Sequence, residues 1–560
     1  GPLEKRELGQ WFWSDIKKYE SVGSPQGEAG GDHVCYHCRL PYNAQFVPGL
    51  ALRAPAGVRI EITVAHDTNC LLSCYITREG EQRHEFIGWM NGEEVIYRIP
   101  RDTVRGVQFY YRETGYPAEF AGSLSCDDAV LNRLWMKARR TLYVTMRDNF
   151  MDCPCRERAQ WPGDMVVQLG QAPYCVDRAA DLLVKKGLRE TLRWQREDGI
   201  IYGPVPEGNW RMELPAQMLA VLSRYGIWTY YMNTADHDTL EELYPHAKRY
   251  LDVWEYQDSG LIKYRPEDKG ATPKSVDGVE VGTWDWLDWG ERIDAEPLLN
   301  LWMILALRGV AEMATVLGKS PDATRLRSRI EQLSAAVNAV FWDAGKQAYR
   351  TAGFSWDPDD RVQAMAILSG VAAAPKHDAL VQWLQRVQQA SPYMEKYVLE
   401  ALFQAGAPGA ALDRMRARYA EMAEAAGTTL WELFRIANTR STANHSWSGG
   451  PLTLLSGRVA GLAPLEPGWR KFSVHPQPGS LTQVTARVVS PFGEIRVNLD
   501  RLPDRWKVEL GVPPGATAVV DLSGLGAGGA GPCEVQGDAT LFQLHSPMTE
   551  APTKRILSHA

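Results

Sequence analysis

Three carboxyl groups and an arginine lie close together in the segment "FMDCPCRERAQWPGDM", residues 150–165. The carboxyl groups belong to Asp152, Glu157 and Asp164, and the guanidinium group belongs to Arg156. Paired carboxyl groups can serve as general acid and general base when one is protonated and the other is ionised. We expect the charges of Asp152 and Asp164, with partial burial, to raise the pKa of Glu157, as suits an acid. Because pairing with Glu157 would oppose that shift, we direct Arg156 toward Asp152 or a ligand.

Proline and glycine make this segment a stiff loop. Pro154 and Pro162 prevent one continuous helix, and Gly163 favours a turn. Trp161 adds a large aromatic face that we expect to be partly buried. A solvated charged loop is the alternative, but charges in a stiff, partly buried loop must pair with one another or with a ligand. We therefore interpret the loop as part of a functional site.

Tryptophan usage indicates the kind of ligand. The chain has 20 tryptophans in 560 residues, and many lie in connections rich in glycine, proline and aspartate. Aromatic faces on loops stack on the apolar C–H faces of sugar rings, so we expect a carbohydrate or glycoside partner. The net charge of -7, without a lysine or arginine block, argues against nucleic acid or an anionic membrane as the partner. We also find no apolar run of the ~18 residues that would span a bilayer.

The cysteines and the first residues bear on cellular location. Nine cysteines leave at least one unpaired, and the single C-x2-C at Cys35 and Cys38 has no second pair to complete a zinc site. We expect reduced thiols and a cytoplasmic protein, with Cys153 and Cys155 used for packing. The opening "GPLEKREL" reads like a cloning scar, so a periplasmic or secreted location stays open.

Hydrophobic periodicity predicts three parts. Residues ~45–120 and ~469–545 alternate apolar and polar residues between turn signals, as in "GVRIEITVAHD" and "QVTARVVS", which is typical of strands. The middle of the chain shows about twelve helical faces, the first marked by Leu131, Leu134, Trp135, Ala138 and Leu142. We predict a mainly α protein: a central (α/α)6 toroid at 123–464, flanked by β-sandwich domains at 1–122 and 465–560.

Alternate connections in such a ring fall at the same end. The connections at that end hold most of the loop tryptophans and acids, in the segments 150–164, 198–212, 257–295, 341–359 and 425–444. The opposite connections, such as "KKG" at 185–187, are short. One decorated end and one plain end predict a single cleft, and chain closure brings Glu157 beside Glu432.

Several of these segments also resemble one known family. "DCPCRERAQWPGD" resembles the D-C-P-x-R-(D)-E-R-x-x-W-x-G-D signature of the glycoside hydrolase family 78 α-L-rhamnosidases, which are six-hairpin enzymes. Further along the chain, "WDWLDW" at 284–289, "TTLWELF" at 428–434 and "NHSWSGG" at 444–450 are similar to the family's G-D-W-L-D, T-T-x-W-E-x-W and L-N-H-Y-A-F-G segments, in the same order. The resemblance covers roughly residues 120–500.

The resemblance implies an inverting exo-glycosidase that cleaves terminal α-L-rhamnosides, with Glu157 as general acid and Glu432 as general base. Hydrolysis of this kind needs no metal and no organic cofactor. Cys155, Trp284 and Phe434 depart from the family pattern, which leaves the sugar open. The expected substrate-binding residues are Asp152, Arg156, Trp161, Asp164, Trp210, Asp285, Trp286, Asp288, Trp431, His445 and Trp447.

Two other functions fit a ring of this kind. A polysaccharide lyase would offer tyrosine or histidine with arginine or asparagine to stabilise an enolate. The decorated loops are instead rich in acids and tryptophan and poor in lysine and arginine, which favours hydrolysis. A non-catalytic sugar-binding protein also stays open, although such a protein gains little from two buried acids.

Overall fold

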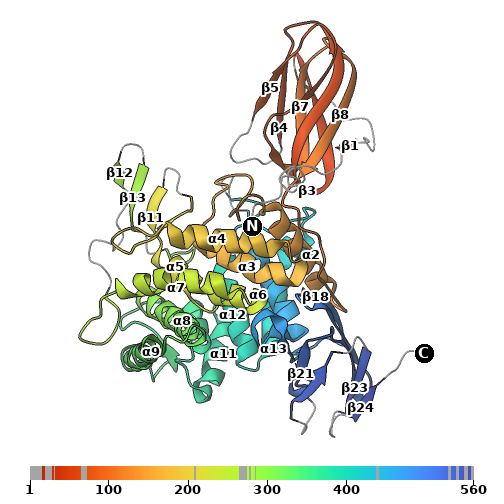
Figure 1. Cartoon of the computed structure of the whole chain (residues 1–560). Coiled ribbons are helices and arrows are strands. Elements are labelled where there is room, and N and C mark those ends of the chain that lie inside the picture. Colours follow the sequence, from red (N-terminus) through yellow and green to blue (C-terminus); the bar gives the residue numbers. More distant parts are fainter. Residues whose placement is uncertain are drawn as a thin grey trace.

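The computed structural model describes residues 16–18, 28–30, 32–64, 72–206, 210–263, 274–276, 279–283, 286–436, 441–526, 531–537, 541–547 and 553–556. An N-terminal β-sheet stands beside a large helical body, and a C-terminal β domain packs at another edge of that body (Figure 1).

The N-terminal part is one sheet organised around an unusually long strand. β3 (His33–Ala54) pairs with β7 (Met90–Pro100) and β8 (Arg105–Thr114), and the order is β1-β8-β3-β7-β4-β5, with β2 and β6 also on β3. The sequence predicted a sandwich of two facing sheets. A single sheet forms because β3 pairs along both edges and thereby joins all eight strands. The remaining strands are β1 (Ile16–Lys18), β2 (Glu28–Gly30), β4 (Arg59–Val64), β5 (Ser73–Ile76) and β6 (Gly80–Glu85).

Helices fill the middle of the chain, as predicted. The predicted apolar face of the first helix is confirmed, since Leu131, Leu134, Trp135, Ala138 and Leu142 are all fully buried. The helices are α2 (Ala129–Val144), α3 (Pro162–Cys175), α4 (Ala180–Arg193), α5 (Pro215–Leu222), α6 (Ile227–Thr234), α7 (His237–Asp252), α8 (Ala295–Val316), α9 (Ser320–Phe341), α10 (Asp360–Leu368), α11 (His377–Arg386), α12 (Pro392–Gln404), α13 (Pro408–Glu424) and α14 (Gly450–Leu454), which continues as a π-helix at Leu455–Val459.

Alternate helices close into an inner ring. α3, α5, α8, α10, α12 and α14 contact one another in that order, and α14 contacts α3. The inner helices carry apolar residues on every side, and every residue of α5 and α10 is buried. The remaining helices are amphipathic and lie outside the ring. Every inner helix therefore begins at the same end of the ring.

Two predicted helices differ from the structure. The segment 213–232 breaks into α5 and α6 at Gly226, where a Cβ atom would lie 1.9 Å from the carbonyl oxygen of Val221. The predicted helix 165–184 ends at Cys175, and the next helix begins at Ala180. Local periodicity does not reveal these breaks, because both sides of each break stay apolar.

The C-terminal domain has two sheets, in the orders β16-β17-β21-β22 and β24-β23-β20-β19-β18-β9. Two strands that the predicted boundaries assign to the helical domain, β9 and β16, pair with C-terminal strands. The strands are β9 (Ser123–Cys126), β16 (Leu462–Pro464), β17 (Lys471–Val474), β18 (Gln483–Ser490), β19 (Gly493–Arg501), β20 (Arg505–Gly511), β21 (Thr517–Val520), β22 (Cys533–Gln536), β23 (Leu541–Pro547) and β24 (Thr553–Ile556).

Small strands decorate the connections into the inner helices. β10 (Tyr202–Gly203), β11 (Trp210–Glu213), β12 (Lys274–Val276) and β13 (Val279–Thr283) form one sheet, and β14 (Trp342–Asp343) pairs with β15 (Ala348–Tyr349). In Figure 1 the strands β11, β12 and β13 project from the helical body.

By length and composition alone, the inner helix α8 is long and apolar enough to cross a membrane, whereas we expected no such segment from the sequence. It has 22 residues and a mean hydropathy of 1.3 over its most apolar stretch. That stretch is 78% buried inside the protein, which is typical of a core helix in a ring.

We predict that Trp135 is critical for the stability of the ring. Trp135 is fully buried in α2, and its indole Nε1 donates to Ser456 Oγ at 3.1 Å, which ties the first hairpin to the last. Trp135→Ala should lower the free energy of unfolding by about 3–5 kcal/mol, because it leaves a large cavity. Urea denaturation followed by far-UV circular dichroism measures the change. Met136→Ala is the control, since Met136 is 49% exposed on the same helix; equal losses in both variants would contradict the prediction.

Candidate active site

The loops that enter the inner helices bring the predicted residues to one end of the ring. Glu157 lies in the loop before α3, and Glu432 lies in the loop before α14. α14 contacts α3, so the first and last hairpins lie side by side where the ring closes. The chain is therefore folded so that residues more than 270 positions apart meet.

A single guanidinium group joins the two glutamates. Arg156 Nε lies 2.7 Å from Glu157 Oε2, while its Nη1 and Nη2 lie 3.1 and 3.2 Å from the two carboxylate oxygens of Glu432. The Glu432 carboxylate is almost fully buried, whereas the Glu157 side chain is 34% exposed. Bidentate contact fixes the plane of the Glu432 carboxylate relative to the arginine. Arg156 thus pairs with both glutamates, where the sequence directed it to Asp152 or a ligand.

The pKa values of Asp152 and Glu157 shift in opposite directions, which corrects the expectation for Glu157. Burial alone would raise the pKa of Glu157, but hydrogen bonds from Asp152 and Arg156 and the charge of Arg156 lower it to about 2. Burial raises the pKa of Asp152 well above its ordinary value, and its hydrogen bond to Glu157 adds to the shift. Asp152 therefore holds the proton of this pair, and Glu157 is the ionised partner.

The buried thiol of Cys153 lies between these acids. Its Sγ is 3.0 Å from Asp152 Oδ2 and 3.2 Å from Glu157 Oε2. Burial raises its pKa well above the ordinary value, so the group is a neutral thiol that donates to a carboxylate. Cys153 therefore does more than the packing that the sequence suggested.

A line of buried polar groups runs from Asp164 to Glu432. His445 Nε2 lies 2.9 Å from Asp164 Oδ1, and His445 Nδ1 lies 2.9 Å from Thr442 Oγ1. Thr442 donates to Glu432 Oε2 from its backbone N–H at 3.1 Å and from its hydroxyl at 3.3 Å. Burial raises the pKa of Asp164, although His445 acts in the opposite direction. Thr442 was missed from the sequence, because a threonine in a loop carries no distinguishing pattern.

Aromatic rings pack together beside these carboxylates. Trp286 stacks on Trp447 with ring centres 5.6 Å apart and an angle of 11° between the planes. Tyr393, at the start of α12, packs against both rings. His445 lies 4.1 Å from Trp447, whose indole N–H donates to the carbonyl of Glu432 at 2.8 Å. The sequence analysis missed Tyr393, which has the position of an ordinary helix residue.

Trp431 and Trp161 flank the two glutamates along the chain. Trp431 is buried, and its carbonyl oxygen accepts from the Ser448 hydroxyl. Trp161 is half-buried at the start of α3. Trp210 lies in β11, and its side chain is outside the described part of the structure, as is Asp285 altogether.

Asp288 contacts protein groups through both carboxylate oxygens. Ser391 donates to it from its hydroxyl and from its backbone N–H, and Arg361 Nη1 lies 3.1 Å from Oδ2. Asp288 and Arg361 have fully buried side chains, and Arg361 also contacts Asp359 at 2.7 Å. In this arrangement Asp288 fixes the loop before α8 to the start of α12, whereas the sequence analysis expected it to bind substrate.

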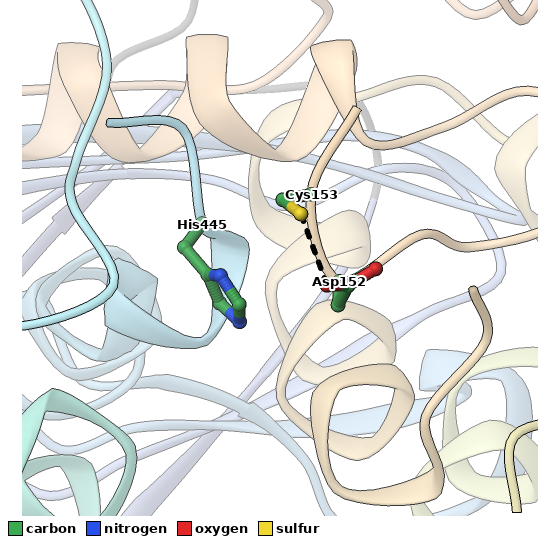
Figure 2. A group of neighbouring side chains, drawn as sticks. All are labelled: Asp152, Cys153 and His445. Carbon is green, nitrogen blue, oxygen red and sulfur yellow. Dashed lines mark hydrogen bonds between the residues drawn. The ribbon is translucent and has the colours of Figure 1, made fainter. Parts of the chain in front are cut away.

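Asp152, Cys153 and His445 form a compact group (Figure 2). One potential ligand atom from each lies within 4.8 Å of the others, close enough to share a metal ion. Metal binding would require loss of the thiol proton, which burial of Cys153 opposes. The group fits a proton-bearing hydrogen-bond cluster better than a metal centre.

The N-terminal sheet supports the loops that carry the site. Asn91 in β7 accepts from Asn444 next to His445, and Asn444 Oδ1 lies 3.1 Å from Cys155 Sγ. Glu93 Oε1 accepts from the backbone N–H of Thr428 at 2.7 Å. These contacts connect the loop of Glu432 to the N-terminal sheet, and Asn444 also reaches the loop of Glu157 through Cys155.

The comparisons with known proteins agree with this architecture. A family model described as the bacterial alpha-L-rhamnosidase six-hairpin glycosidase domain matches residues 119–459, and one for the bacterial alpha-L-rhamnosidase C-terminal domain matches residues 461–532. An alpha-L-rhamnosidase of Streptomyces avermitilis is 24% identical over 474 residues, which are 77% of this chain and 42% of that protein.

Solved structures show the same fold. The family 78 rhamnosidase of Bacillus sp. GL1 superposes with a TM-score of 0.75 at 25% identity, over 89% of this chain and 54% of that one. The Streptomyces avermitilis alpha-L-rhamnosidase complexed with L-rhamnose gives a TM-score of 0.75 at 18% identity, over 91% and 50% of the two chains. The chain thus spans about half the length of these relatives.

The closed ring of helices and the matching family model and structures define a six-hairpin glycosidase fold, with an N-terminal sheet and a C-terminal β domain. The chain belongs to the bacterial alpha-L-rhamnosidases of glycoside hydrolase family 78, which confirms the resemblance seen in the sequence.

We predict that Arg156 determines how the site responds to acid. Arg156 helps to lower the pKa of Glu157 from 4.5 to about 2, so their contact stabilises the fold above about pH 4.5 and loses strength as the pH falls toward 2. The melting temperature of the wild type should therefore exceed that of Arg156→Met near neutral pH, and this difference in melting temperature should narrow below about pH 4.5. Thermal melts across this range measure it. Arg158→Met is the control from the same loop, since the Arg158 guanidinium lies 3.6 Å from the ring centre of Trp89; a gap that is constant with pH would contradict the prediction.

Proposed function

We propose that this chain hydrolyses terminal α-L-rhamnosides with inversion, using Glu157 as general acid and Glu432 as general base. The main support is that both glutamates contact the single guanidinium group of Arg156, beside stacked tryptophans, at the decorated end of the ring. Membership of the rhamnosidase family and the relative complexed with L-rhamnose support the choice of sugar.

The position of Arg156 supports the inverting geometry. An inverting pair of carboxyl groups lies ~6.5–9.5 Å apart, which leaves room for a water molecule opposite the leaving group. Arg156 contacts Glu157 through Nε and Glu432 through Nη1 and Nη2, so both carboxyl groups lie around one guanidinium group. When substrate enters, Arg156 turns to the sugar hydroxyls, and the sugar and the attacking water take its place.

The Asp152–Glu157 pair can supply a proton although the pKa of Glu157 is low. Asp152 holds a proton and donates it to Glu157, so the pair carries one proton while Glu157 itself is ionised. As the glycosidic bond breaks, this proton passes from Asp152 to Glu157 and on to the leaving oxygen, and the pair takes up a new proton from solvent before the next turnover. Departure of Arg156 toward the sugar raises the pKa of Glu157 and assists this transfer.

Glu432 is suited to activate water. Its buried carboxylate accepts from Thr442 through the backbone N–H and the hydroxyl, and these bonds hold the group in one orientation. Glu432 takes a proton from water as the water oxygen attacks the anomeric carbon on the face opposite the leaving group. Asp164 and His445 then form hydrogen bonds with the sugar hydroxyls, and Trp286 and Trp447 supply an apolar face for the sugar ring.

We predict that the two glutamates respond differently to the leaving group. Glu157→Gln should lose about 10²–10⁴ in kcat/KM on rhamnosides with poor leaving groups, and much less on p-nitrophenyl α-L-rhamnoside, because a good leaving group hardly needs protonation. Glu432→Gln should lose about 10² or more on both, because every turnover needs activated water. Glu331→Gln is the control, since Glu331 is exposed on the outer helix α9.

NMR of the freshly released sugar tests the stereochemistry. Inversion predicts the β-anomer as the first product. Retention of configuration, or near-normal turnover by Glu432→Gln, would overturn the assignment of Glu432 as base. A panel of p-nitrophenyl glycosides tests the sugar itself, and faster turnover of a glycoside other than the rhamnoside would overturn that part alone.

A further inference from the structure

A cavity lies at the plain end of the ring, away from the glutamates. Its volume is about 410 Å³, within the usual range for small-molecule sites. The inner helices α3, α12 and α14 begin at the active-site end and reach this cavity with their later turns, and α6, β16 and β17 complete the walls. The lining includes Arg224, Trp228, Lys396, Glu400 and Arg458.

The cavity collects positive charge around one carboxylate. Glu400 Oε1 lies 3.0 Å from Arg458 Nη2 and 3.6 Å from Arg224 Nη2. Burial alone would raise the pKa of Glu400, but the charges of Arg224, Arg458 and Lys396 lower it to about 2, so Glu400 is ionised. Three cations therefore face one anion among the described lining residues, apart from His475, which pairs with Asp521 at 3.2 Å.

Lys396 is the surplus cation. The residue is 3% exposed, and its ammonium group lies 4.2 Å from the ring centre of Tyr225 and 4.6 Å from that of Tyr397. Within the described chain it donates to no oxygen and pairs with no carboxylate at 4.0 Å or less. Burial lowers its pKa to about 8, so the group is still mostly protonated at neutral pH. The buried Nε of Arg224 also has no hydrogen-bond partner among the described residues.

We propose that this cavity is a second ligand site that binds the phosphate group of inorganic phosphate or of a small sugar phosphate. A desolvated cation without a carboxylate partner, as Lys396 is, is unfavourable unless an anion joins it, and Arg224 and Arg458, whose side chains are 36% and 32% exposed, add positive charge nearby. Arginine and lysine together offer the fork and the point charge that phosphate oxygens accept. The volume exceeds the needs of a bare phosphate ion, and the half-buried Trp228 offers a face for an attached sugar ring.

A purely structural role explains less of this cluster. One arginine would neutralise Glu400, and Arg458 already lies at hydrogen-bond distance from it. Arg224 lies 3.6 Å from Glu400 and also donates to the Tyr225 hydroxyl at 2.7 Å, so it is a second cation beside a carboxylate that Arg458 already pairs. Lys396 stabilises no helix end and reaches no backbone carbonyl in the described chain. An oxyanion in the cavity would give Lys396 the partner that it lacks.

Isothermal titration calorimetry on the full chain tests the proposal, with inorganic phosphate, glucose 6-phosphate and glucose as the three titrants at constant ionic strength set by chloride. We expect saturable binding of phosphate or glucose 6-phosphate, and none of glucose. Lys396→Met should weaken the Kd about tenfold or more while rhamnoside hydrolysis is unchanged. Lys186→Met, at an exposed pair with Glu190 on the outer helix α4, is the control and should keep the wild-type Kd.

The titrants distinguish the source of the phosphate. A Kd for glucose 6-phosphate about tenfold below that for phosphate identifies a sugar phosphate, and equal values identify the free ion; both support the site. Three results would overturn it: no saturable binding of either phosphate titrant, an unchanged Kd in Lys396→Met, or equally tight binding of glucose. A thermal melt of Lys396→Met confirms that the variant is folded, which we expect because it removes a buried charge without changing its length much.

Discussion

The contact of Arg156 with two glutamates is the interaction on which the active site depends. Three charged groups, two of them substantially buried, are stable together only if each has a partner of opposite charge in good geometry. Glu432 contacts the end of the guanidinium group, and Glu157 contacts its side. This requirement brings the loop before α3 against the loop before α14. The pairing of Arg156 and the closure of the ring therefore depend on each other.

Other parts of the chain hold these loops rigid from outside. Asn91 and Glu93 in the N-terminal sheet bind the loop of Glu432, while Asp288 and Arg361 fix a neighbouring loop with fully buried charges. Buried polar networks of this kind add little net stability but specify one arrangement strongly when every member is satisfied. Many of the buried polar contacts of the protein thus hold the loops at the end of the ring that carries Glu157 and Glu432.

The sequence predicted the ring and the meeting of Glu157 with Glu432, because helical periodicity and the alternation of loops are local patterns with a global consequence. It did not predict the partner of Arg156, and it gave the wrong direction for the pKa of Glu157. That direction depends on which of several nearby groups reaches the carboxylate, a matter of ångströms between side chains. Thr442 and Asn91 were missed for the same reason, since their roles arise only from contacts across the fold.

The closing of the ring between its first and last hairpins also determines the order in which the cluster around Arg156 can form. During synthesis Glu157 leaves the ribosome long before Glu432, and 276 positions separate Arg156 from its second partner. In a chain that lacks the last hairpin, Arg156 and Glu157 have no Glu432 opposite them and no Trp447 beside them. The last hairpin is therefore needed to complete this cluster, and the cluster forms only after the ring has closed.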